Sequence, residues 1–63
     1  MIELMIDQWT HPDGSLRYLW SVWRSGKRIG LGDSTPTSEA AETAGRLWCQ
    51  KNLAQPPDRV TRL

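Results

Sequence analysis

Hydrophobic and polar residues alternate at the start of the chain. The stretch IELMID at residues 2–7 places apolar side chains at every second position, with Trp9 two residues beyond. A period of two predicts a strand over residues 2–9 with one apolar face. The segment from His11 to Gly14 then has the residue types of a tight turn, since Pro12 presets φ and Gly14 accepts positive φ.

Two more strands are predicted on either side of a second turn. Residues 16–24, LRYLWSVWR, alternate in the same way, and a tight turn at residues 25–27 separates them from RIGLG at residues 28–32. In the last of these strands, Gly30 and Gly32 leave one face without side chains, which allows close approach of a large neighbouring residue such as Trp.

Helical spacing replaces alternation after a polar link. Ala-rich residues 37–53 have the apolar period of a helix, and either Thr35 before Pro36 or Thr37 fits the N-cap. Pro56 and Pro57 prevent the helix from continuing. The tail, residues 54–63, either docks through its apolar residues or adds a short edge strand.

These elements predict an α+β fold in one domain, residues 1–63. A three-stranded antiparallel meander carries one helix, with Leu47 and Trp48 as its bulk, across one face of the sheet. The residues expected beneath the helix are Ile2, Leu4, Ile6, Leu16, Tyr18, Trp20, Val22, Ile29 and Leu31. Those expected on the opposite face are Met5, Trp9, Leu19 and Trp23, flanked by Arg17 and the two strand glycines.

Because one helix covers only one face of a small sheet, the second face is the main candidate site. An exposed apolar patch on a sheet usually marks an interaction surface. Three interpretations stay open. In the first, the face is covered within the chain: Trp9 lies in the loop and Trp23 folds over Gly30 as a lid, or the tail covers the face. In the second, a second copy of the chain binds there, and in the third a different protein does.

Composition makes the four Trp residues stand out, because the chain has 63 residues and one Cys. A lone Cys forms no internal disulfide, and with a single His it builds no closed zinc site. An unpaired Cys is typical of a reducing compartment. No apolar run is long enough to span a membrane, and the acidic start is unlike a signal peptide. We therefore expect a cytoplasmic protein without membrane association.

The net charge of +1 hides an uneven distribution. Residues 1–13 and 33–42 contain acids and no Lys or Arg, whereas residues 14–32 contain bases and no acid. We expect the blocks to pair across neighbouring elements.

The residues offer little chemistry for catalysis. His11 lies in a predicted exposed turn, and Cys49 lies near the apolar side of the helix, where free Cys usually acts as a small buried hydrophobe. No Ser has an evident base to activate it. We expect no enzymatic activity, no metal and no cofactor.

A basic hairpin is the second candidate site. Arg17, Arg24, Lys27 and Arg28 are interleaved with Trp residues on the second and third strands. Cations contact phosphates and aromatic rings stack on single-stranded bases, so this pattern favours binding of DNA or RNA. The sequence pI near 8.0 is below the value above 9 that is usual for nucleic-acid-binding domains.

The segments WRSGKRIGLG at residues 23–32 and TSEAAETA at residues 37–44 resemble the hairpin-plus-helix half of two module types. One is the double-stranded RNA-binding domain, and the other is the arm-type DNA-binding domain of phage integrases. The first has a basic cluster where this chain has Glu39 and Glu42. The second contacts DNA through its sheet, which implicates the four cations named above. The chain also resembles small bacterial and phage domains of unknown function.

From the sequence we expect a small non-enzymatic interaction protein. Its first predicted partner is a protein or a second copy, bound through Trp9, Leu19, Trp23 and Met5. The alternative is nucleic acid bound through the basic hairpin.

Overall fold

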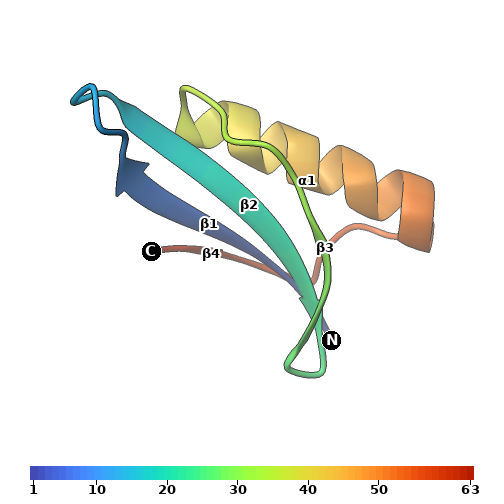
Figure 1. Cartoon of the computed structure of the whole chain (residues 1–63). Coiled ribbons are helices and arrows are strands. Elements are labelled where there is room, and N and C mark those ends of the chain that lie inside the picture. The colour runs from blue at the N-terminus through green and yellow to red at the C-terminus, as the bar shows by residue number, and fades with distance from the viewer.

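The computed structural model describes all residues, 1–63, as one four-stranded sheet with one helix on it. The elements are β1 (Ile2–Thr10), β2 (Leu16–Arg24), β3 (Lys27–Leu31), α1 (Ser38–Leu53) and β4 (Arg59–Arg62). The strands lie in the order β3-β2-β1-β4, with α1 along one face (Figure 1). The predicted α+β fold is confirmed, and the tail forms the edge strand rather than covering a face.

The long hairpin of β1 and β2 is the frame of the sheet. Its antiparallel register runs unbroken from the pair Ile2 and Arg24 to the pair Thr10 and Leu16. At the turn, the His11 amide donates to Ser15 O at 2.8 Å, and Gly14 has φ of +91°. This positive φ is the reason for glycine at the turn.

A β-bulge shifts the phase of β3. Val22 pairs with Gly30 and Trp23 pairs with Arg28, which leaves Ile29 as the extra residue. Beyond the bulge, Leu31 pairs with Ser21 on the face away from α1 and is 60% exposed. The expectation that Leu31 lies beneath the helix, with the two glycines opposite, was therefore wrong.

Gly30 and Gly32 instead face the helix side, and an indole ring lies over each. A Cβ at Gly30 would be 2.5 Å from Cζ2 of Trp48, and one at Gly32 would overlap the ring of Trp20. The two rings pack against each other, with centroids 6.3 Å apart and planes at 51°. Large side chains therefore do cover the two glycines, as expected, but they are Trp20 and Trp48 and not Trp23.

The helix starts at the second of the two predicted caps. Thr37 is extended, and its Oγ1 accepts a 3.0 Å hydrogen bond from Ala40 N. Thr35 instead bridges to Tyr18 and donates to Thr37 O at 2.8 Å. At the other end, Ala54 takes a left-handed conformation with φ of 56°, and its N–H donates to Gln50 O.

Small residues bring α1 close to the sheet. Ala41, Gly45 and Cys49, spaced four apart, are its buried positions, and a Cβ on Gly45 would overlap Leu4. Leu47, expected to pack inward, is 54% exposed because it projects from another side of the helix. Leu16, also expected beneath α1, is exposed at the end of β2. The buried apolar residues are Ile2, Leu4, Ile6, Trp20, Val22, Ala41 and Cys49.

β4 lies parallel to β1 and joins the two ends of the chain. Asp58 N donates to Ile2 O at 2.8 Å, and Ile2 N donates back to Asp58 Oδ2 at 2.7 Å. On the face away from α1, Arg59 contacts the Glu3 carboxylate at 3.1 Å, and Thr61 Oγ1 donates to the same oxygen at 2.7 Å. The Thr61 and Arg59 hydrogen bonds hold the pKa of Glu3 below its usual range.

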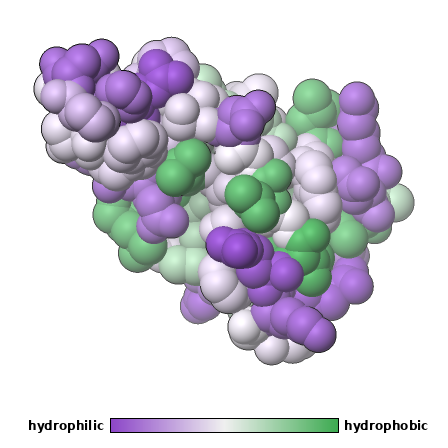
Figure 2. Space-filling view, in the orientation of Figure 1, coloured by the Kyte–Doolittle hydropathy of each residue, from purple (hydrophilic) through white to green (hydrophobic).

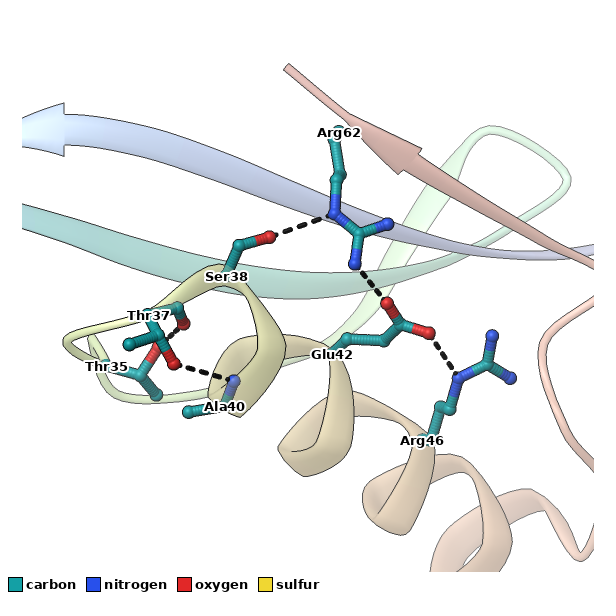
Figure 3. Close-up of polar contacts among 7 residues, drawn as sticks. All are labelled: Thr35, Thr37, Ser38, Ala40, Glu42, Arg46 and Arg62. Atoms are coloured by element: carbon teal, nitrogen blue, oxygen red, sulfur yellow. Dashed lines mark hydrogen bonds and ion pairs between the residues drawn. The ribbon is translucent and has the colours of Figure 1, made fainter.

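On the helix side, Arg62 ties β4 to α1 (Figure 3). Its guanidinium donates to Ser38 Oγ at 2.9 Å and to the Glu42 carboxylate. Glu42 also accepts from Arg46 Nε at 2.8 Å, one turn further along the helix. These two arginines lower the pKa of Glu42, with Arg46 contributing most.

Replacing Gly30 with Val tests the close approach of Trp48 to β3. The new side chain displaces the indole from Trp20, so we expect the free energy of unfolding to fall by about 2 kcal/mol. Leu31→Val is the matched control on the same strand, and it should change stability by less than about 0.5 kcal/mol. Urea unfolding followed by circular dichroism measures both, and equal stabilities would contradict the packing.

Acid should weaken the attachment of β4. The folded-state pKa values of Glu3 and Glu42 are depressed, so their stabilisation is complete above the unfolded-state value near 4.5. It is lost as the pH falls through the lower folded-state values. We expect the urea midpoint to drop between pH 6 and pH 3, and to drop less in Glu3→Gln/Glu42→Gln. Glu39→Gln, at an exposed helical site without an ion pair, should behave like the unmodified protein.

Candidate protein-binding face

The face of the sheet away from α1 is covered by no other part of the chain. We call it the open face, and it is built by alternation on all four strands. Its members are Glu3, Met5, Asp7, Trp9, Arg17, Leu19, Ser21, Trp23, Arg28, Leu31, Arg59 and Thr61. All four residues predicted for the protein-binding site lie on it.

Apolar and charged side chains are interspersed on this face. In β1 and β2, Trp9 lies opposite Arg17, Asp7 opposite Leu19, and Glu3 opposite Trp23. Trp9 is 38% exposed, whereas Met5, Leu19 and Trp23 are half-buried by their neighbours. Figure 2 shows separate hydrophobic patches with hydrophilic residues between them on the side of the molecule turned to the viewer. A mixed surface of this kind is usual for an interface that forms and dissociates.

Trp23 is held in one orientation. Its Nε1 donates to Ser21 Oγ at 2.9 Å, two residues back on the same side of β2. The indole also borders a shallow hollow of about 280 Å³, lined by Met1, Glu3, Trp23, Ser25, Gly26 and Arg59. A fixed aromatic ring loses little conformational entropy when a partner covers it.

Trp9 borders a second hollow at the opposite end of the face. This hollow has a volume of about 330 Å³ and is lined by Trp9, His11, Asp13, Ser15, Arg17 and Ser34. Trp9 contacts His11, with ring centroids 5.6 Å apart. Side-chain and backbone hydrogen bonds from Ser15 lower the pKa of Asp13, so this end holds a stable negative charge.

The four cations of the predicted nucleic-acid site do not form one cluster. Arg24, Lys27 and Arg28 gather at the turn between β2 and β3, whereas Arg17 lies at the other end of β2, roughly 23 Å away at ~3.3 Å per residue. Arg17 donates to Ser34 Oγ at 3.2 Å. None of the four forms an ion pair, so the expected pairing of charge blocks does not extend to residues 14–32.

Sequence reasoning missed three members of the open face. Leu31 lies on it because of the bulge, and no turn-forming residue at Ile29 indicates a bulge in the sequence. Arg59 and Thr61 reach it because β4 pairs with β1. Alternation of RVTR at residues 59–62 is the signal that could have placed them, once a strand is assumed there.

The two titratable groups considered for catalysis, Cys49 and His11, are not members of the open face. Cys49 is fully buried on the side of α1 that faces the sheet. Burial raises the pKa of its thiol, which disfavours the nucleophilic thiolate. His11 is exposed in its turn, with Nδ1 3.4 Å from Asp13 Oδ1. The largest hollow, about 460 Å³ near the end of α1, is lined by Arg46, Gln50, Ala54, Gln55 and Pro56. None of these five side chains is a ready nucleophile or general base.

The one helix, Ser38–Leu53, is too short and too polar to cross a membrane. No protein-family model, curated protein or solved structure matches this chain.

Proposed function

We propose that this protein is a non-enzymatic binding module that docks a protein on its open face. The observation that carries the proposal is the set Met5, Trp9, Leu19, Trp23 and Leu31, which no other element covers and which lies opposite the face that packs against α1. Aromatic residues on an exposed, well-ordered surface are the side chains that contribute most to protein association.

The geometry also favours a protein over a nucleic acid for this face. Asp7 lies on it, opposite Leu19 and without an ion-pair partner, and Glu3 lies beside Trp23. Carboxylates at these positions repel the phosphates of a nucleic acid.

A double variant tests the proposal. Leu19→Thr/Trp23→Thr removes two apolar groups from strand positions that α1 does not cover, so the protein should still unfold cooperatively on heating. Peptide ligands selected from a displayed random library against the unmodified protein should lose at least tenfold in affinity for this variant, as measured by biolayer interferometry.

Leu47→Thr, at the exposed leucine of α1, is the matched control and should leave these affinities unchanged. Ligands that bind the double variant and the unmodified protein equally would overturn the proposal. Loss of the folded state in the double variant would also overturn it, because the two residues would then belong to the core.

Nucleic-acid binding is the second candidate, favoured by the unpaired cations Arg24, Lys27 and Arg28 at one hairpin. Three phosphate contacts predict that log K for duplex DNA falls against log salt with a slope of about −2.7. Fluorescence anisotropy with labelled duplex and single-stranded 20-mers measures this slope. Lys27→Ala should weaken binding while Arg17→Ala does not, and no binding at 50 mM salt would exclude this candidate.

A further inference from the structure

Charge is polarised along the long axis of the molecule, which measures 36 Å. At and beside the open face, the end with the β1–β2 turn carries Asp7 and Asp13 against Arg17. On the open face, the end with the β2–β3 turn carries Arg28 and Arg59 against Glu3. We call these the acidic end and the basic end.

We infer that a second copy of this chain docks on the open face in antiparallel orientation, with the acidic end of each copy over the basic end of the other. The inference rests on the proposed function and names the partner for it. It follows from the charge pattern, because a parallel stack would set like charges against each other, whereas a two-fold axis across the strands pairs opposite ends twice.

The two tryptophans suit this arrangement. Trp9 borders the hollow at the acidic end and Trp23 borders the hollow at the basic end. The two-fold axis brings the Trp9 end of one copy onto the Trp23 end of the other. It also brings Trp23 toward the partner copy's Arg17 and Asp7. An arginine next to an indole face is an attractive cation–π contact.

The size of the face sets the strength of the dimer. With strands about 4.8 Å apart and a rise of about 3.3 Å per residue, the strand residues of one copy cover roughly 430 Å². Two copies then bury roughly 860 Å², below the ~1,000 Å² of stable specific interfaces. A dimer of this size is therefore weak and reversible.

A charge exchange tests both the partner and its orientation. Arg28→Glu makes both ends acidic, and Asp7→Lys makes both ends basic. Sedimentation equilibrium should show that the unmodified protein dimerises, more weakly as salt rises, and that each variant alone loses at least tenfold in dimer affinity. An equimolar mixture of the two should recover a dimer. Lys51→Glu, on the solvent side of α1, is the control and should dimerise normally.

Orientation is read from a spin label at Ser25→Cys in the turn of the basic end. Cys49 is fully buried, so the introduced thiol takes the label. In an antiparallel dimer the two labels lie at opposite ends of the assembly, tens of ångströms apart, and a short label-to-label distance would overturn the orientation.

A protein that stays monomeric up to millimolar concentration, or variants that dimerise like the unmodified chain, would overturn the inference. If the monomer still loses its selected peptide ligands on Leu19→Thr/Trp23→Thr, the open face binds a different protein and the proposed function stands. If the protein does not dimerise and its peptide ligands bind Leu19→Thr/Trp23→Thr as tightly as the unmodified protein, both proposals fail.

Discussion

The packing of two indole rings against bare backbone is the interaction on which this small fold depends. Trp20 lies over Gly32 and Trp48 over Gly30, and the rings meet above β3. The chain has no disulfide, and its fully buried side chains are few. Trp supplies area that shorter apolar residues cannot, at roughly 150–250 Å² each. The glycines make this burial possible, since any side chain at either position would push a ring off the strand.

Because α1 is the only helix and packs on one face of the sheet, no element covers the other face. The helix contacts β1 and β2 through small residues, so it lies close and spans little width. Everything that projects the other way from the sheet is exposed or half-buried, including two further tryptophans. Because α1 packs on one face only, Trp9 and Trp23 lie at the two ends of a face that no other element covers. An exposed apolar patch of this kind usually marks an interaction surface.

Local patterns predicted most of the fold and most of the open face. Alternation identified β1 and β2, helical spacing identified α1, and the phase of these strands placed Met5, Trp9, Leu19 and Trp23 correctly. Leu31, Gly30 and Gly32 were assigned to the wrong faces because a bulge at Ile29 reverses the alternation, and a bulge depends on pairing with β2 that the sequence of β3 does not encode. The direction of β4 was also beyond local reasoning. Its parallel pairing with β1 depends on where α1 ends relative to the sheet. The four cations were grouped because they are close in sequence, yet Arg17 and Arg24 lie near opposite ends of the nine-residue strand β2.

The pair of hydrogen bonds between Ile2 and Asp58 has a consequence for biosynthesis. The outer edge of β1 exposes unpaired amides and carbonyls until residues 58–62 are available to cover it. During translation the edge of β1 therefore stays unprotected until residues 58–62 have left the ribosome, and such edges are templates for pairing with other chains. The 56 positions between Ile2 and Asp58 set this interval at several seconds, at ordinary elongation rates of about 5–20 residues per second. The arginines that flank Val60 and Thr61 then place charge along the new edge, which discourages further strands from adding to it.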